Sequence, residues 1–178
     1  FFLRKGYARA YSVSEAGQEL TLIIFKQDDI FPLAWAINNI INTYYVEAVT
    51  NIELNRAPRD VFNQFLNNNP DVLSELTAKI LTRFTGVLER MEYLAFGNAH
   101  EKVASILLIL SERFGKKEGK DIIVQVPFTH KDIAGFLGLV RETASIELKK
   151  LEKKGIIAYR GRFIIVKDQD RLKEESLL

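Results

Sequence analysis

The chain has 178 residues, of which 47% are apolar and 27% charged, the composition of a globular protein with a buried core. It contains no cysteine, which excludes disulfides, thiolate catalysis and a cysteine-ligated iron–sulfur cluster. No apolar run approaches the roughly 18 residues of a membrane-spanning helix, and no secretory signal is visible. The sequence begins Phe-Phe-Leu without a methionine, so we expect that residue 1 is not the native start.

The net charge of +2 is unevenly distributed along the chain. Residues 1–97 carry 9 Lys and Arg against 11 Asp and Glu, whereas residues 98–178 carry 16 against 12. The basic excess is concentrated between residues 127 and 167, where 9 basic residues stand against 4 acidic ones. An acidic first part joined to a basic second part points weakly to nucleic acid as the partner of the second part.

The first part of the chain predicts β-strands. Side chains alternate over residues 7–13 and again over 20–24, on either side of the glycine-bearing turn SEAGQE, which is the pattern of a hairpin. The segment YYVEAVTNIELNR, residues 44–56, predicts one further strand. Pro58 then opens a short helix that extends to about Leu66, since proline suits the first helical turn.

A single long helix is predicted for about residues 69–97, with Asn69 as its N-cap and Pro70 as its first helical residue. A helix packed against its own domain would explain its apolar stripe, but average helices have only ~12 residues. A partner helix in a symmetric dimer explains a stripe of this length better. The predicted dimer interface, at steps of three and four residues, is Leu73, Leu76, Ile80, Phe84, Val87, Met91 and Leu94.

The last part of the chain predicts helices that alternate with short strands. A helix over 98–114 starts from the capping-box pattern NAHE and is followed by the loop GKKEGKD and the short strand IIVQVPF. A capping box of Thr129 and Asp132 opens a short helix that Gly138 ends, and a second helix begins two residues later. The segment GIIAYRGRFIIV predicts two short strands around a turn. This order of elements predicts a winged helix-turn-helix.

The second helix of such a motif lies in the DNA major groove, with its N-terminal residues against base edges. Arginine donates to a guanine edge and glutamate accepts from the cytosine amino group. A solvated amphipathic helix is the alternative, but the caps, the glycine and the wing favour DNA. The predicted base-reading residues are Arg141, Glu142, Ser145 and Ile146. The predicted phosphate contacts are Thr129, His130, Lys131, Thr143, Lys149, Lys153, Arg160 and Arg162.

The segment FTHKDIAGFLGLVRETASIELKKLEKKGII resembles the DNA-binding segment of the Crp–Fnr bacterial transcription regulators. RKGYARAYSVSEAGQELTLIIFKQDDIF resembles the middle strands of their cyclic-nucleotide-binding β-roll, and NPDVLSELTAKILTRF resembles their dimer helix. The resemblance implies an α+β fold: a β-roll without its first strands and a long dimerisation helix in residues 1–97, and a winged helix-turn-helix in 98–178. It also implies a homodimer on a palindromic DNA site of about two turns, with an effector at the roll coupled to the DNA-reading helices.

The effector pocket departs from the family pattern. Members that bind cyclic nucleotides carry a Gly-Glu-Leu stretch and an Arg-Ser pair around a phosphate, whereas this chain has Phe31-Pro32-Leu33 and roughly Tyr44-Tyr45. Proline removes a backbone donor, and no arginine lies between Lys26 and Arg56, so we expect that cyclic AMP is not the effector. The apolar segment packs in the core or, as the less favoured alternative, lines a pocket for a hydrophobic effector. The residues of that pocket would be Phe31, Leu33, Trp35, Tyr44 and Tyr45.

Two more departures fall on the second helix of the motif. Val140 stands where the family usually has a Ser or Thr cap, and a missing cap costs roughly 1 kcal/mol. Ile146 stands where many members place a second base-reading arginine. Isoleucine can make only apolar contact, for instance with a thymine methyl group. The alternative is that Ile146 packs inside its own domain.

Other chemistry has little support in the sequence. His100 and His130 each stand near a helix start, where a surface or capping role is expected. No metal-ligand cluster, phosphate-binding glycine loop or nucleophile–base arrangement is present, so we expect no catalytic residues, metal or cofactor. The sequence predicts a cytoplasmic transcription regulator whose partners are double-stranded DNA, a second copy of the chain and RNA polymerase. The alternatives are a ligand-binding module whose helix-turn-helix contacts protein, and an enzyme subunit regulated by a β-roll.

Overall fold

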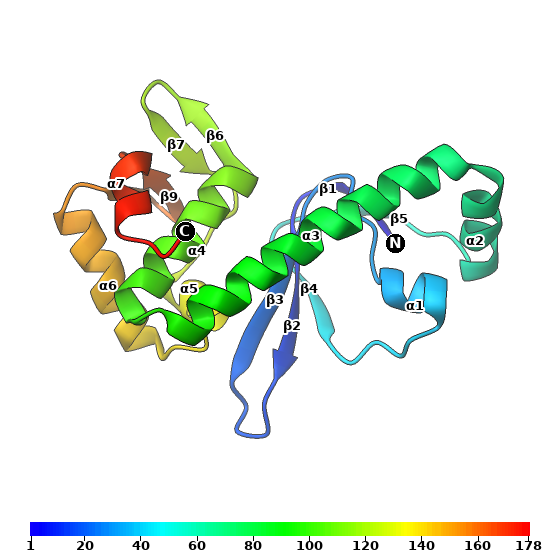
Figure 1. Cartoon of the computed structure of the whole chain (residues 1–178), viewed down its shortest axis with the longest axis horizontal. Helices are drawn as coiled ribbons and strands as arrows, with labels where there is room; N and C mark the ends of the chain where they lie inside the picture. Colours follow the sequence, from blue (N-terminus) through cyan, green and yellow to red (C-terminus); the bar gives the residue numbers. More distant parts are fainter. The chain divides into compact units, whose positions relative to one another are not determined.

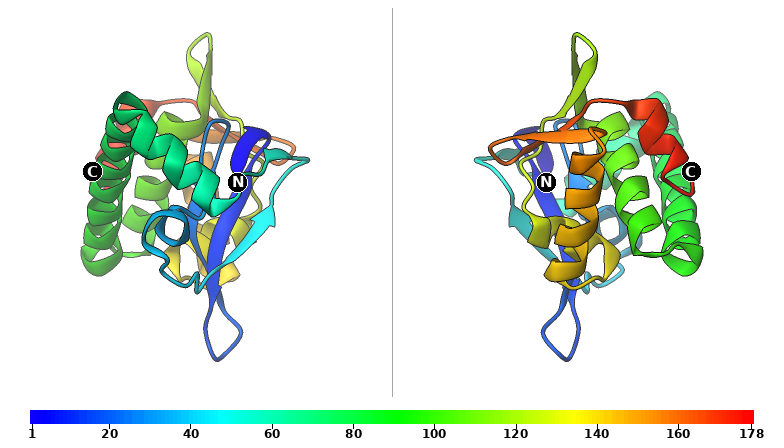
Figure 2. Two further views of the ribbon diagram at one scale, coloured as in Figure 1. Left: turned by 90° about the vertical axis from the view of Figure 1, so that its right-hand side faces the viewer. Right: turned by 90° about the vertical axis from the view of Figure 1, so that its left-hand side faces the viewer.

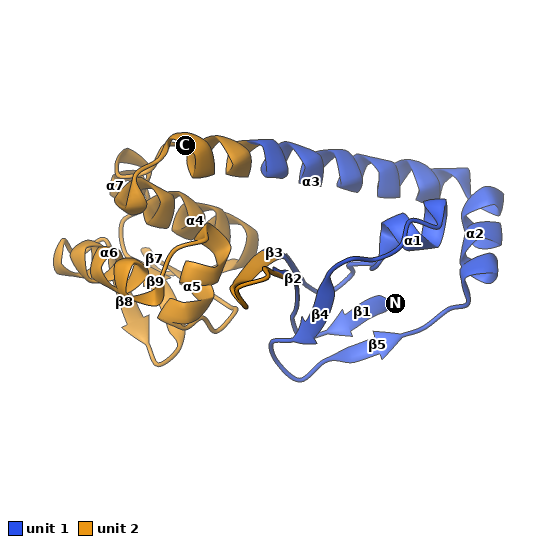
Figure 3. Ribbon diagram, turned by 90° about the horizontal axis from the view of Figure 1, so that it is seen from below, with its two compact units in different colours: residues 1–12, 22–88 blue, residues 13–21, 89–178 orange.

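The computed structural model describes all residues, 1–178. It divides into two compact units, which are shown in different colours in Figure 3. Unit 1 comprises residues 1–12 and 22–88, and unit 2 comprises residues 13–21 and 89–178. The long helix α3, Pro70–Phe96 (Figure 1), contributes to both units. None of the helices combines the length and apolarity that crossing a bilayer requires.

The first part of the chain forms five short strands and two helices. These are β1 (Phe2–Lys5), β2 (Ala8–Val13), β3 (Glu19–Phe25), α1 (Leu33–Asn38), β4 (Tyr45–Ala48), β5 (Glu53–Asn55) and α2 (Arg59–Asn68). The strands form a β1–β5 pair and a three-stranded sheet in the order β3–β2–β4. The predicted hairpin is thus confirmed as β2 and β3. A small apolar core in unit 1 is built from Leu3, Ala8, Ala10, Phe25 and Phe31.

The single strand predicted over 44–56 is wrong, because β4 and β5 belong to different sheets. The pairing of β4 with β2 ends near Val49, whose N–H donates to the carbonyl of Tyr7. The hydroxyl of Thr50 then accepts from the Tyr7 N–H at 2.9 Å. Gly6 has φ 82°, and a Cβ there would lie 2.2 Å from the carbonyl oxygen of Asn51. Glycine therefore allows the backbone between β1 and β2 to approach closely the segment that joins β4 and β5.

Core packing was also the wrong interpretation for much of the segment after Phe31. It forms helix α1 without one buried residue, and Trp35 is 43% exposed. Ile41 is 82% exposed and Tyr45 is 60% exposed. Phe31 alone among the five proposed pocket residues is buried, where its ring stacks on Phe25 with centroids 4.4 Å apart.

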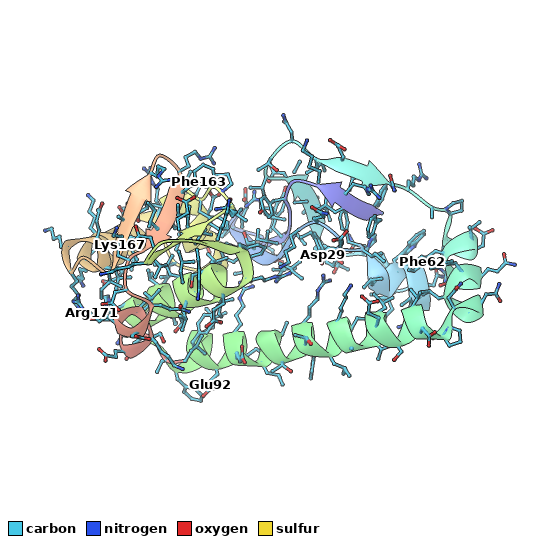
Figure 4. The ribbon with its side chains drawn as sticks, turned by 90° about the horizontal axis from the view of Figure 1, so that it is seen from above. Asp29, Phe62, Glu92, Phe163, Lys167 and Arg171 are labelled. Carbon is cyan, nitrogen blue, oxygen red and sulfur yellow. The ribbon has the colours of Figure 1, made fainter.

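Unit 2 holds the predicted winged helix-turn-helix. Its elements are α4 (Ala99–Phe114), β6 (Gly115–Glu118), β7 (Asp121–Val124), α5 (His130–Leu137), α6 (Arg141–Lys153), β8 (Ile157–Arg160), β9 (Phe163–Val166) and α7 (Gln169–Glu174). The strands form one antiparallel sheet in the order β6–β7–β9–β8. Phe163, the first residue of β9, and Lys167, which follows its last residue, are labelled in Figure 4.

The segment GKKEGKD was predicted as a loop, but it forms most of a β-hairpin. Lys116 and Lys117 pair with Ile123 and Ile122, and Gly119 turns the chain with φ 63°. Figure 2 shows this hairpin projecting from the helices of its unit. Exposed lysines on an edge strand do not follow a strand pattern, so only the pairing with the apolar β7 reveals the element.

Helix α3 confirms the predicted long helix within one residue at each end. Asn69 was predicted to cap the start of this helix, but its side-chain amide instead donates to the carbonyl of Phe65, in the preceding helix, at 2.7 Å. Three α3 residues spaced by seven turn toward their own chain. Leu76 is buried, Arg83 pairs with the buried carboxylate of Asp29, and Arg90 donates to the carbonyl of Thr21. The inward face of α3 is therefore partly polar.

Candidate nucleic-acid interface

The helix-turn-helix is fixed by two local signals that the sequence already carries. Thr129 Oγ1 accepts from the Asp132 N–H at 3.2 Å, and the Asp132 carboxylate accepts from the Thr129 N–H at 2.6 Å. These reciprocal bonds form the predicted capping box at the start of α5. Gly138 ends α5 with φ 62°, a conformation that glycine adopts without strain. The predicted turn between α5 and α6 is confirmed.

Helix α6 presents one apolar face to its unit. Ala144, Leu148 and Leu151 are each 0% exposed, as their spacing of four and three residues predicts. Val140 precedes the first helical residue and provides no side-chain cap, which confirms the missing cap. Packing of the apolar face therefore holds the helix in place while its first backbone N–H groups lack a side-chain partner.

The outer face of the first two turns of α6 carries most of the predicted base-reading side chains. Arg141 and Glu142 are exposed, and Ile146 is 55% exposed, so Ile146 does not pack inside its domain. Ser145 is half-buried, and its Oγ lies 2.9 Å from Nδ1 of His130. Arg141, Glu142 and Ile146 thus form an accessible patch, whereas the Ser145 hydroxyl faces α5.

Most of the predicted phosphate contacts are exposed side chains on the same two helices and on the wing. Lys149 and Lys153 lie further along α6, and Lys131 lies on the first turn of α5. The wing contributes Arg160 and Arg162, and Arg160 Nη1 lies 3.4 Å from a carboxylate oxygen of Glu118. This pair is largely exposed, so it offers little resistance to a phosphate that competes for the guanidinium.

Two predicted phosphate contacts are less accessible than the lysines. Thr143 is half-buried on α6. The Thr129 hydroxyl donates to the Asp132 carboxylate at 2.7 Å and accepts from the Asp132 N–H, so the capping box already uses it. Thr129 nevertheless marks the N-terminus of α5, and a helix N-terminus favours anions. Lys131, in the first turn of the same helix, adds a positive charge there.

His130 is the first residue of α5 and connects three elements of the motif. Its Nδ1 is hydrogen-bonded to Ser145 of α6, and its ring centroid lies 5.8 Å from that of Tyr159 in β8. Burial, and then the positive charges of Arg141 and Lys149, hold the pKa of His130 below its ordinary value. Sequence reasoning placed His130 near a phosphate but missed its partners, because Ser145 is fifteen residues away.

A second polar cluster, on the other side of α6, was missed as well. Glu147 is 7% exposed, and His100 bridges it to Glu175 with distances of 2.9 Å and 2.7 Å from its two ring nitrogens. Burial opposes ionisation of Glu147, but hydrogen bonds from Lys150 and His100 outweigh it and hold its pKa below the ordinary value. His100 therefore ties α4, α6 and the residue after α7 together, instead of the surface or capping role that we predicted.

The apolar cavity of unit 1 has a volume of about 530 Å³ and lies at α1, α2 and the β1–β5 pair. Phe31 and Trp35 line it, as predicted for an effector pocket, but Leu33, Tyr44 and Tyr45 do not. The Tyr44 side chain packs instead against the small core of unit 1, and Tyr45 stacks on Tyr11. Only two of the five predicted pocket residues therefore line the cavity.

Two arginines after the apolar segment also line this cavity. Arg59 Nε donates to the carbonyl oxygens of Trp35 at 3.1 Å and Ala36 at 3.0 Å. The Arg56 guanidinium lies 6.0 Å from the ring of Phe1. The sequence showed no arginine within the segment itself, and only the fold brings Arg56 and Arg59 to it.

The predicted dimer stripe is mostly exposed in the single chain. Phe84, Val87 and Met91 are 58%, 50% and 62% exposed, and Leu73 and Ile80 are exposed as well. Leu76 was wrongly included, because it is 8% exposed and packs on its own chain. Leu94 is half-buried. Leu81 and Leu88, which are 60% and 49% exposed, extend the same face and were missed.

Comparisons with known proteins agree with this architecture. Residues 1–69 match the cyclic nucleotide-binding domain family, and residues 101–175 match the Crp-like helix-turn-helix domain family. The chain is 28% identical over 168 residues to the global nitrogen regulator of Nostoc sp., covering 93% of this chain and 75% of that protein. It is 25% identical to the anaerobic regulatory protein of Pasteurella multocida, covering 99% of this chain and 64% of that protein.

Solved structures show the same fold. A transcriptional regulator of the CRP/FNR family from Thermus thermophilus superposes with a TM-score of 0.76 and 27% identity, over 97% of this chain and 84% of that chain. FixK2 from Bradyrhizobium japonicum gives a TM-score of 0.82 at 21% identity, over 99% and 86% of the two chains, which supports the fold alone. Together with the two matched domain families, these similarities show that the chain belongs to the Crp–Fnr family of transcription regulators.

Proposed function

We propose that the chain binds DNA as a homodimer on a palindromic site, through the first turns of α6. The accessible patch of Arg141, Glu142 and Ile146 carries this proposal, because these side chains lie where a recognition helix meets base edges. Arg141 provides guanine recognition through its planar fork, and Glu142 accepts from a cytosine amino group. Ile146 provides apolar contact with a thymine methyl group.

The basic side chains around the patch supply the sequence-independent part of binding. Lys131, Lys149 and Lys153 are exposed on the two helices, and Arg160 and Arg162 are exposed on the wing. Thr143 and the Thr129 end of α5 add polar contacts at the same face. Each neutralised phosphate releases counterions, so the affinity falls with salt at a slope of about 0.9 per contact.

The apolar face of α3 supports the homodimer. Phe84, Val87 and Met91 lie on one side of the helix, with Leu81 and Leu88 beside them, and all five are about half exposed or more. Monomeric proteins rarely leave so continuous an apolar stripe in water. A second copy of the same helix buries it by a self-complementary, two-fold contact. Residues 1–97 then act as the sensing and dimerising part, and residues 98–178 as the DNA-binding domain.

We further propose that the effector is not cyclic AMP. Pro32 precedes α1 and lacks the N–H that a phosphate-binding turn would offer, and α1 has no buried residue around such a site. Arg59, the arginine nearest to α1, is engaged with backbone carbonyls of that helix. The apolar cavity beside Phe31 and Trp35 suits a hydrophobic small molecule instead.

The proposed role is regulation of transcription in the cytoplasm, with RNA polymerase as the protein partner, and no catalytic step is assigned to the chain. Selection of DNA from a random pool tests the base-reading patch directly. We expect an inverted repeat for the wild type, the loss of one base preference per half-site for Arg141→Ala, and an added guanine per half-site for Ile146→Arg.

The control for this selection is Lys173→Ala, an exposed charge on α7 outside the patch, which should leave the selected site unchanged. Failure to enrich any sequence would contradict the proposal and favour a helix-turn-helix that contacts protein. An unchanged site for folded Ile146→Arg would remove this position from base recognition.

A further inference from the structure

His130 stands out among the residues of the basic face because it is titratable near neutral pH. It begins α5, where the positive end of the helix dipole opposes a charge on the ring. Arg141 and Lys149 of α6 also oppose that charge, whereas Glu152 of the same helix favours it weakly. The free domain therefore disfavours the charged imidazole.

The two side chains in direct contact with the His130 ring, those of Ser145 and Tyr159, carry no charge at neutral pH. Tyr159 of the wing packs at a ring distance of 5.8 Å, and burial raises the pKa of its hydroxyl to about 12. Ser145 engages Nδ1, and Asp132 of the same helix is held in the capping box with Thr129. The imidazole is hydrogen-bonded to a hydroxyl and not to a carboxylate in the free chain.

The hydrogen bond to Ser145 also sets the orientation of the imidazole. With Nδ1 held by Oγ at 2.9 Å, Nε2 is the nitrogen left for a ligand. A phosphate that meets the N-terminus of α5 and the side chain of Lys131 approaches the same region. A phosphate reverses the local charge balance, because its negative charge offsets the charges of Arg141 and Lys149.

We propose that His130 is a proton-linked phosphate ligand, neutral in the free protein and protonated when a DNA phosphate meets its Nε2. The inference rests on the proposed DNA-binding function and deepens it. The imidazole gains one proton from solvent as the complex forms, Nδ1–H donates to Ser145, and Nε2–H donates to the phosphate. DNA binding is then coupled to proton uptake, and the affinity increases as the pH falls.

The direction follows from the pKa of His130 in the two states. In the free protein, burial and then the charges of Arg141 and Lys149 hold the pKa of His130 below its ordinary value, which favours the neutral ring, and a bound phosphate raises the pKa. Between the free and bound pKa values, the affinity increases by up to about tenfold for each pH unit lost. Below the free pKa, both states are protonated and the gain levels off.

The test measures binding of the full chain to a labelled duplex of about 30 base pairs, since phosphate contacts need no specific sequence. Fluorescence anisotropy is recorded between about pH 5.5 and about pH 8 at constant ionic strength. We compare the wild type with His130→Gln, which keeps a hydrogen-bonding side chain but cannot titrate. The matched control is His100→Gln, because the chain contains only 2 histidines.

We expect the wild type and His100→Gln to bind more tightly at low pH, and His130→Gln to lack that gain. At about pH 5.5 the salt slope of the wild type should exceed that of His130→Gln by about 0.9, and at about pH 8 the two slopes should agree. Equal pH dependence in the wild type and His130→Gln would overturn the inference while leaving DNA binding intact. Absence of binding at every pH would contradict both.

Titration of the two imidazoles by NMR gives a readout that needs no variant. The His130 signal in the free protein should titrate below the ordinary range of histidine, and it should titrate at a higher pH in the presence of the duplex. The same titration midpoint with and without DNA would overturn the inference, whatever the binding curves show.

Discussion

The winged helix and the long helix α3 use apolar side chains in opposite ways. In α4, α5 and α6 the periodic apolar residues are buried, with Val103, Leu107 and Leu148 each at 0% exposure. In α3 the corresponding stripe stays in water, with Phe84 at 58% and Met91 at 62% exposure. Periodicity alone therefore identifies a helix with an apolar face but does not tell whether the chain itself covers that face.

The charged residues of α3 explain the difference. Arg83 and Arg90, at seven-residue spacing from Leu76, bind partners within the chain and occupy the inward side of the helix. The apolar stripe is rotated away from these arginines, so it faces outward. The winged-helix unit covers its own apolar core, whereas the apolar stripe of α3 stays exposed in the single chain.

Charged residues on the exposed stripe should have the largest effect. We expect Val87→Asp with Met91→Asp to abolish the dimer, since an unpaired buried charge costs about 3–5 kcal/mol, and to abolish specific DNA binding as a consequence. Sedimentation velocity and a DNA-binding assay measure the two losses. Thr82→Asp, an exposed position on the opposite side of α3, is the matched control and should retain both. A double variant that stays dimeric and binds specifically would remove α3 from the mechanism.

Truncation in the core of the winged helix should act on folding instead of association. Leu148→Ala creates a cavity at a residue with 0% exposure and should lower the free energy of unfolding by about 2–5 kcal/mol. Leu81→Ala on α3, at 60% exposure, removes the same atoms and should leave unfolding of a monomer nearly unchanged. Urea denaturation followed by circular dichroism compares the two. Equal losses at low protein concentration would show that α3 buries its stripe within the chain.

Arg141→Ala should affect DNA recognition without affecting either core. The side chain is exposed and is not needed for packing, so the melting temperature should not change. Its proposed fork to guanine is worth about 1–3 kcal/mol, and the loss should fall on one base pair per half-site. Lys153→Ala should weaken all sequences alike and reduce the salt slope by about 0.9. Equal weakening of all sequences by Arg141→Ala would reassign this arginine to a phosphate contact.

The smallest expected effect is a gain in stability at the start of α6. Val140 has the extended backbone of an N-cap, with φ −73° and ψ 148°, but provides no side-chain hydrogen bond. Val140→Ser should add a cap and increase the free energy of unfolding by roughly 1 kcal/mol. Val140→Ala, which adds no acceptor, is the control. No gain from serine over alanine would show that the first turn of α6 is already satisfied.

Local signals explain which features the sequence predicted correctly. The bounds of α3, the capping box of Thr129 and Asp132, and the turn at Gly138 depend on neighbouring residues, and all agree with the structure. The faces of α6 follow from helical spacing in the same way. Regular periodicity and capping residues are therefore sufficient to place the motif.

The features that the sequence missed depend on contacts between distant segments. His100 meets Glu147 and Glu175, which lie 47 and 75 residues away, and no local pattern marks either pair. Strand β6 is visible only through its pairing with β7. Leu76 shares the spacing of the exposed stripe, and its burial depends on how α3 is rotated against its own chain. Such contacts can be identified only when the fold is known.

One measurement tests the central claim directly: the stoichiometry and spacing of the complex with DNA. Sedimentation of the full chain with selected duplexes should give two protomers per duplex. Binding should be tight when the half-site centres are about 34 Å apart and should weaken strongly when about five base pairs are inserted between them. One protomer per duplex, or equal affinity for both spacings, would contradict a homodimer that reads an inverted repeat with two copies of α6.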